Sequence, residues 1–197
     1  MQKISNLICS FLLVLLSFSD ALSQTSGGLS LQAGLSYGFS QEQALTRSGQ
    51  GHYGWCAGAD ARLFGGDVYF LIGGQYHKTS LFSTEKLNFF KTDMTVVMGR
   101  MGMGFSLARL GYKSYLRTKI LASINFIANG PDPSSAFPGA VSPANLNDSY
   151  LGGVTGIGWT KGRLDLDLEF QYGILNSVFG QPKTTFNYFT LLCGINI

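Results

Sequence analysis

The residue types that carry most protein chemistry are scarce in this chain of 197 residues. His52 and His77 are its only histidines, and two neighbouring imidazoles could bind a metal ion or act as general acid and base. No third metal ligand is evident near them, and no set of nucleophile, base and acid can be placed on one face. We therefore expect no enzyme, no metal and no cofactor, and keep the two histidines as a candidate polar site at a rim.

Acidic residues in one segment alternate strictly with apolar residues. Between Leu164 and Ile174 the even positions are apolar, while Asp165, Asp167 and Glu169 occupy odd positions. A helix would spread these acids around its surface, whereas a strand places them in one row. The same period of two recurs along the chain after residue 28, and helical periodicity does not. The elements that position the charged residues are therefore predicted to be β-strands.

The predicted strands are joined by connections of two alternating lengths. We predict eight strands, at about residues 29–38, 52–63, 68–78, 93–107, 114–128, 148–160, 164–175 and 185–197. Short glycine-containing turns at Phe64–Asp67, Ala108–Lys113 and Thr160–Arg163 alternate with long segments at 39–51, 79–92, 129–147 and 176–184. This pattern is typical of outer-membrane β-barrels. The fold class is thus predicted as all-β, an eight-stranded antiparallel up-and-down transmembrane β-barrel within residues 24–197.

Composition favours a membrane barrel over a soluble one. Charged residues make up 13% of the chain, against roughly 25% in an average soluble domain. A net charge of +3 is too small to indicate nucleic-acid binding. A secreted barrel of the lipocalin type also alternates, but its apolar side chains point inward and its exterior is charged. Here the polar face is rich in glycine and serine, which suit a crowded interior, so the apolar face is predicted to contact lipid.

Assignment of faces by alternation places eight charged side chains inside the predicted barrel. They are Asp60, Arg62, Arg100, Arg117, Lys119, Asp165, Asp167 and Glu169. An eight-stranded barrel is only wide enough to be filled by side chains, and an unpaired charge there is costly. We therefore expect these charges to pair and close the lumen rather than form an ion or proton path. A turn centred on residues 161–162 would place Gly156 opposite Asp167 and Gly158 opposite Asp165, leaving room for long basic side chains.

The same assignment places both histidines inside, near the rim with the long loops. A tight turn at residues 65–66 would make His52 and His77 diagonal neighbours on adjacent strands. Cys56 is predicted to point inward and Cys193 toward lipid. Opposite faces exclude a disulfide between the two without large backbone movement.

The first 23 residues have the features of an export signal. Lys3 supplies a positive charge, Leu7–Phe18 is an apolar run of 12 residues, and Ala21 and Ser23 are small residues before Gln24. As a helix such a run spans about 18 Å, less than the ~30 Å of a bilayer core. We expect a cleaved signal peptide at residues 1–23 and export to the outer membrane of a Gram-negative cell.

The long connection at residues 79–92 combines large apolar side chains with lysines. Its apolar members are Phe82, Leu87, Phe89 and Phe90. Apolar side chains in a long exposed loop often mark a partner surface. They could also fold over the barrel mouth or touch lipopolysaccharide head groups, and the sequence leaves both interpretations open.

The C-terminal segment carries a family resemblance. The alternating leucine and acid run of Leu164–Gly173 is followed by Ile174-Leu175-Asn176, a polar loop, and a last strand that closes with Leu191–Ile197. This arrangement resembles the outer-membrane β-barrel domain of PorT-like proteins of the Bacteroidota. The family pattern closes on an aromatic residue, whereas this chain ends in Ile197. The resemblance implies an outer-membrane barrel and, through PorT, a link to the type IX secretion and gliding apparatus. It implies no catalytic residue.

The expected function is that of a non-enzymatic outer-membrane barrel acting as a structural or assembly component. We expect it to contact outer-membrane lipid, lipopolysaccharide, and protein partners in the outer membrane or periplasm. We expect no binding to nucleic acid. Two alternatives stay open. One is a small-solute channel or transporter, and the other is a lipid-modifying barrel enzyme.

Overall fold

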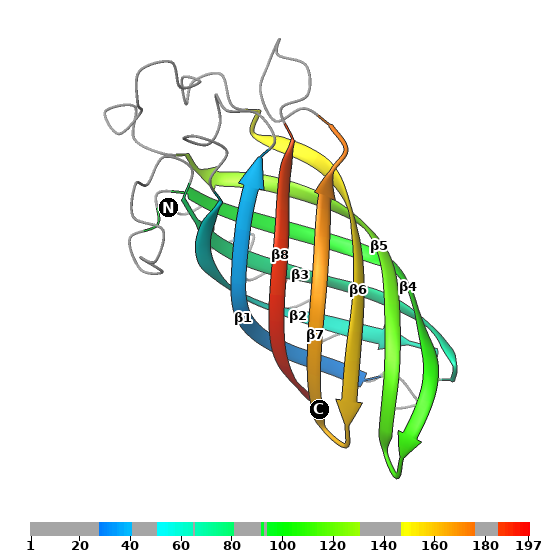
Figure 1. Ribbon diagram of the computed structural model, residues 1–197. Coiled ribbons are helices and arrows are strands. Elements are labelled where there is room, and N and C mark those ends of the chain that lie inside the picture. Colours follow the sequence, from blue (N-terminus) through cyan, green and yellow to red (C-terminus); the bar gives the residue numbers. More distant parts are fainter. Residues whose placement is uncertain are drawn as a thin grey trace.

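The computed structural model describes residues 28–40, 51–64, 66–80, 92, 94–130, 147–175 and 185–197. They form one closed antiparallel barrel in which each strand pairs with its neighbours in sequence and the last strand pairs with the first (Figure 1). The strands are β1 (Gly28–Ser40), β2 (His52–Leu63), β3 (Val68–Thr79), β4 (Met94–Gly111), β5 (Ser114–Asn129), β6 (Ser149–Lys161), β7 (Leu164–Gly173) and β8 (Phe186–Asn196). The predicted all-β, eight-stranded, up-and-down barrel is confirmed. In this part of the chain, no helix is both long and apolar enough to cross a membrane.

Short turns join β2 to β3, β4 to β5, and β6 to β7 at one end of the barrel, here called the short-turn end (Figure 1). The opposite, long-loop end leads to connections that lie mostly outside the described residues. The turn predicted at Ala108–Lys113 is wrong in extent, because β4 continues to Gly111. Two register shifts, after Ser106 and after Arg109, let β4 keep pairing with β5.

Apolar side chains cover the outside of the barrel. Leu35, Leu191 and Leu168 lie side by side on β1, β8 and β7. Each is about half exposed, at 51%, 49% and 52% respectively. Comparable exposed residues occur on the other strands, among them Ile72, Met101, Ile120, Ile124 and Ile157. This distribution is the reverse of the soluble lipocalin-type arrangement, in which the apolar face points inward.

The inside of the barrel is mainly polar, with one apolar cluster that the alternation pattern did not single out. Its members are Tyr69, Leu71, Met98, Leu121 and Val154, all less than 10% exposed. They pack at inward positions of four consecutive strands, β3 to β6. The interior is thus filled by side chains of both kinds, as the width of an eight-stranded barrel requires.

Both cysteines of the strands lie on the faces predicted for them. Cys56 is buried inside, Cys193 is exposed outside, and both are free thiols. The predicted signal peptide at residues 1–23 lies outside the described residues. The same is true of the loop side chains that we singled out as a partner surface, Phe82, Leu87, Phe89 and Phe90.

Candidate functional site

Eight charged side chains meet inside the barrel and form one network of ion pairs. They are Asp60 and Arg62 of β2, Arg100 of β4, Arg117 and Lys119 of β5, and Asp165, Asp167 and Glu169 of β7. These are the eight residues that alternation placed in the lumen. Acids and bases alternate along the contacts, so each charge has at least one opposite partner. We call this set the charge network.

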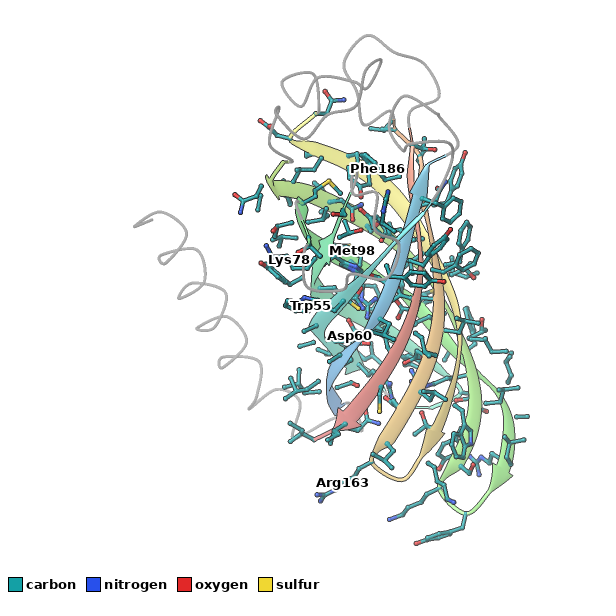
Figure 2. All side chains as sticks on the ribbon, turned by 60° about the vertical axis from the view of Figure 1, so that its left-hand side comes forward. Trp55, Asp60, Lys78, Met98, Arg163 and Phe186 are labelled. Atoms are coloured by element: carbon teal, nitrogen blue, oxygen red, sulfur yellow. The ribbon has the colours of Figure 1, made fainter. Side chains whose placement is uncertain are left out.

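Arg100 joins two acids from opposite sides of the barrel. Its Nε donates to Asp60 Oδ1 at 2.9 Å and its Nη2 to Asp60 Oδ2 at 2.5 Å, which is a bidentate fork. Its Nη1 donates to Glu169 Oε2 at 2.7 Å. The side chain of Arg100 has no exposed surface, and those of Asp60 and Glu169 are 4% and 3% exposed. Arg100 therefore links β2, β4 and β7 across the lumen, and Figure 2 labels its partner Asp60 at about mid-height of the barrel.

A ladder of charges connects β5 to β7. Lys119 contacts Glu169 Oε1 and lies 3.7 Å from Asp167 Oδ1. Arg117 Nη2 donates to Asp167 Oδ2 at 2.7 Å and lies 3.3 Å from Asp165 Oδ2. β6 lies between these strands, so the basic side chains reach across it. The ladder braces three strands on the side of the barrel opposite Asp60.

Asp165 ends the network at the short-turn side. It pairs with Arg62 of β2 and accepts a 2.5 Å hydrogen bond from Thr160 Oγ1 and a 3.3 Å hydrogen bond from Ser30 Oγ. At the opposite end of the chain of ion pairs, Gln32 Nε2 donates a 2.6 Å hydrogen bond to Asp60 Oδ2. Thr160 satisfies the Asp165 oxygen that the bases leave free, while Ser30 and Gln32 add a second donor to oxygens that already accept from an arginine. These neutral donors limit the cost of burying the acids.

Glycines make room for the network where a basic side chain crosses an intervening strand. Gly73 of β3 lies between Asp60 and Arg100, and a Cβ there would be 2.0 Å from Asp60 Oδ1. On β6, a Cβ at Gly158 would be 2.0 Å from Asp167 Oδ1 and 3.2 Å from Arg117 Nε. The general role predicted for the β6 glycines is therefore visible in the space around them.

The predicted register of the two β6 glycines, Gly156 and Gly158, relative to β7 is wrong by two residues. Gly156 lies opposite Glu169 and Gly158 opposite Asp167, while Thr160 lies opposite Asp165. The turn is centred on Gly162 and Arg163, because Gly162 takes the positive φ of 61° that a two-residue hairpin turn requires at its first central position. A slip of two keeps every side chain on its face, so the charged residues still point inward.

Replacement of Gly158 by alanine is expected to disturb the network. The new Cβ would push Asp167 off its position, so Arg117 would lose its 2.7 Å partner. We expect Gly158→Ala to lower the free energy of unfolding in detergent by about 1–3 kcal/mol, as overpacking does. Gly153→Ala on the same strand is the matched control, because the nearest atoms to a Cβ there are 4.0 Å away. Equal stability of the two variants in urea titrations would show that the glycine is not needed for the network.

The two histidines do not form the diagonal pair that we predicted. Both are buried, but His77 lies opposite Cys56, so His52 is four positions away in register, roughly 13 Å at 3.3 Å per residue. Leu63 lies opposite Phe70, so the pairing of β2 with β3 is centred between Gly66 and Asp67 rather than on residues 65–66, and this shifts the register by two residues. His77 Nε2 bonds instead with Gln75 Oε1 at 2.9 Å, and its ring packs on Tyr188 at 5.4 Å.

Polar and aromatic side chains fill the interior toward the long-loop end. Tyr150 packs on Phe186 with ring centres 6.0 Å apart. Gln171 Nε2 donates to Asn125 Oδ1 at 2.9 Å between β7 and β5. All four side chains are less than 5% exposed. Among the described residues, no group of three or more histidines, cysteines or acids is arranged to hold a metal ion.

Sequence reasoning missed two members of the site. They are Gln32 and Gly73, neither of which the alternation pattern singled out. The available signal for Gly73 was the pair Gly73-Gly74 inside a predicted strand, which marks a close approach. No signal in the sequence identified Asp60 as the partner of Gln32, because their contact depends on the register between β1 and β2.

Comparison with known proteins locates the fold only. No protein-family model matches the chain, and no curated protein does. The crystal structure of Neisserial surface protein A is similar, with 12% identity, a TM-score of 0.53 and coverage of 88% of this chain and 98% of that one. The attachment invasion locus protein Ail of Yersinia pestis, solved with the heparin analogue sucrose octasulfate, has 13% identity, a TM-score of 0.44 and coverage of 87% and 99%. The likeness to the Neisserial protein shows a shared eight-stranded barrel.

Proposed function

We propose that this protein is a non-enzymatic β-barrel of the outer membrane whose lumen is closed. The membrane location is supported by the apolar outer face, on which neighbouring leucines such as Leu35, Leu191 and Leu168 are about half exposed. A soluble protein rarely exposes so continuous an apolar surface. A barrel can cross a bilayer because closure leaves no strand edge unpaired in lipid.

The proposal of a closed lumen rests on one observation. The charge network is a continuous chain of ion pairs across the lumen, with Asp60 at one end and Arg62 at the other. Arg100 bridges acids on β2 and β7, and it is the only base of the charge network that contacts Asp60, so it cannot move aside without leaving that buried acid unpaired. Such an arrangement is costly to open, because each separated charge loses its partner in a poorly hydrated space. The network therefore supports a structural role over a small-solute channel or transporter.

Within the described residues, the geometry gives a lipid-modifying enzyme little support. His52 and His77 are four positions apart in register. His77 is engaged with Gln75 and Tyr188. A catalytic set needs a nucleophile, a base and an orienting group within hydrogen-bond reach.

The finer role that we propose is that of an assembly component whose long loops or short turns contact protein partners. The resemblance of residues 164–197 to PorT-like barrels supports a place in a type IX secretion or gliding apparatus. The loop at 79–92, with Phe82 and Phe89, is the first surface to test for such a partner.

A tagged pull-down from native outer membranes in mild detergent tests this role. We expect a secretion or gliding component to be recovered in a fixed ratio to the tagged barrel, with stoichiometry measured by mass spectrometry. Deletion of residues 81–90 should abolish recovery if that loop is the contact, while the variant barrel still shows heat-modifiable migration. Recovery of the barrel alone, as a monomer, would contradict the assembly role and leave a free-standing structural barrel.

A further inference from the structure

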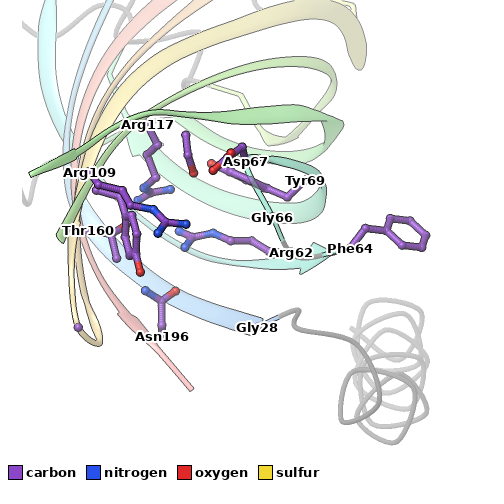
Figure 3. A pocket seen from close by; sticks show the side chains of 13 residues that line it. Gly28, Arg62, Phe64, Gly66, Asp67, Tyr69, Arg109, Arg117, Thr160 and Asn196 are labelled. Atoms are coloured by element: carbon purple, nitrogen blue, oxygen red, sulfur yellow. The ribbon is translucent and has the colours of Figure 1, made fainter. Parts of the chain in front are cut away.

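The short-turn end of the barrel opens into a cavity of about 400 Å³. Its floor is the outermost part of the charge network, Arg62 and Arg117, and its wall includes Arg109 of β4. Figure 3 shows these three arginine side chains directed toward the same space. Asp67 is the only carboxylate among the described residues that line it.

Two of these arginines have donors without acceptors. Arg62 gives its Nη2 to Asp165, and Arg117 gives its Nη2 to Asp167 and Asp165. In contrast, Arg62 Nε and Arg117 Nε and Nη1 are buried and make no well-aligned hydrogen bond, and the neutral group beside the Arg117 guanidinium is the Tyr69 hydroxyl, which also lines the cavity. Arg117 as a whole is only 4% exposed. Buried donors usually have partners, so unpaired guanidinium nitrogens beside a cavity indicate a missing acceptor.

The acids beneath the cavity are already engaged by bases of the charge network, and the second oxygen of Asp167, Oδ1, faces Lys119 Nζ at 3.7 Å. Asp165 already receives contacts from Arg62, Arg117, Thr160 and Ser30. The charge network has four acids and four bases and is balanced within itself. Arg109 is not part of the charge network. Its guanidinium carbon lies over the Tyr115 ring, 6.0 Å from the ring centre. The charge available to a ligand therefore comes from Arg109 together with the free nitrogens below it.

The surroundings of the mouth add positive charge. Lys113 lies in the β4–β5 turn, and Lys161 and Arg163 lie at the β6–β7 turn, all exposed. Figure 2 shows Arg163 at the tip of that turn. Exposed charges of one sign around a concave site attract counter-ions, although salt screens them over about 10 Å. They would draw an anion toward the mouth without contacting it inside.

We propose that this cavity binds a phosphate group. Guanidinium groups present paired donors whose spacing matches phosphate oxygens, and three of them converge on this cavity. The volume accommodates a phosphate ester or a lipid head group. Neither the fold nor the proposed closed lumen requires this site, so it stands or fails separately from the proposed function.

The test is binding of inorganic phosphate to the mature chain, folded in a phosphate-free amine-oxide detergent and followed by calorimetry at constant ionic strength. We expect saturable binding to the wild-type protein near one phosphate per barrel. Arg109→Gln should weaken it about tenfold, the loss of one charge-assisted hydrogen bond of roughly 1.4 kcal/mol. Arg109 has no part in the charge network, and heat-modifiable migration checks that the variant is folded.

Arg163→Gln is the matched control, with the same change of charge at an exposed residue that does not line the cavity. It should change phosphate affinity by no more than about twofold, since its charge is screened. Absence of saturable binding to the wild type, or equal weakening by Arg109→Gln and Arg163→Gln, would overturn the site.

A second arm separates the two sources of phosphate. The titration is repeated with the barrel in phosphatidylglycerol nanodiscs. Loss of binding of added phosphate there, with binding retained in detergent, supports the site and assigns it to a lipid head group. Retained binding in both environments supports the site and assigns it to a soluble phosphate ester.

Discussion

Replacement of Arg100 by methionine is expected to lower the free energy of unfolding by about 3–5 kcal/mol. Arg100 makes three hydrogen bonds, two to Asp60 and one to Glu169, from a side chain with no exposed surface. Methionine keeps much of the volume, so the loss comes mainly from the acids: Asp60 is left without a base, and Glu169 keeps only Lys119. Unfolding in urea from lipid vesicles, followed by tryptophan fluorescence, measures the difference.

Two further variants make this result specific to the charge network. Arg163→Met removes an arginine from the exposed β6–β7 turn and should change stability by less than about 0.5 kcal/mol. The double variant Arg100→Met, Asp60→Asn also removes the acid that is left without a base, because Glu169 still pairs with Lys119, and it should recover part of the loss. If Arg100→Met were as stable as Arg163→Met, the network would not contribute to the stability of the barrel.

Replacement of Leu191 by arginine is expected to lower the free energy of unfolding in lipid vesicles, and so the stability of the barrel, by about 2–4 kcal/mol. Leu191 is at the centre of β8, on the outer face, between Leu35 of β1 and Leu168 of β7. In a transmembrane barrel that position faces the bilayer core, where an arginine must be buried in hydrocarbon or distort the bilayer. Urea titration in vesicles measures the cost.

Leu164→Arg is the matched control for this experiment. Leu164 is also a leucine on the outer face, 58% exposed, but it is the first residue of β7 next to the short turn. There the cost of an arginine falls to about 0–1 kcal/mol, because the side chain reaches the interface. Costs near zero for both variants would mean that the outer face contacts water, and the membrane location would be wrong.

Strand positions and faces could be predicted from the sequence because alternation reports them directly. The run from Leu164 to Gly173 assigns Asp165, Asp167 and Glu169 to one face whatever the neighbouring strands do. The structure places them, and their predicted basic partners, in the lumen. A crowded interior with both signs of charge then leaves ion pairing as the favourable arrangement.

Register could not be predicted in the same way. Alternation is unchanged when a strand slips by two residues, so it did not distinguish Gly158 opposite Asp165 from Gly158 opposite Asp167. The turn decides between them, and its centre depends on which residue takes a positive φ, here Gly162. The same ambiguity at the β2–β3 turn produced the incorrect pairing of His52 with His77.

Which acid each base of the charge network contacts also depends on how the strands close into a barrel. Arg100 and Glu169 are 69 residues apart in sequence and lie on β4 and β7, and they meet across the lumen of the closed barrel. Sequence reasoning identified the group of eight but not which acid each base would contact. The cavity at the short-turn end depends on the ends of several strands, so its three arginines could not be grouped from the sequence.

Electrical recording across a planar lipid bilayer tests the closed lumen most directly. The purified mature barrel is reconstituted from detergent, with protein-free detergent as the baseline. Because the charge network fills the interior with paired side chains that are almost fully buried, we predict no stable conductance steps above that baseline. Reproducible single-channel steps of constant size from the wild-type protein would contradict a closed lumen and favour a small-solute channel.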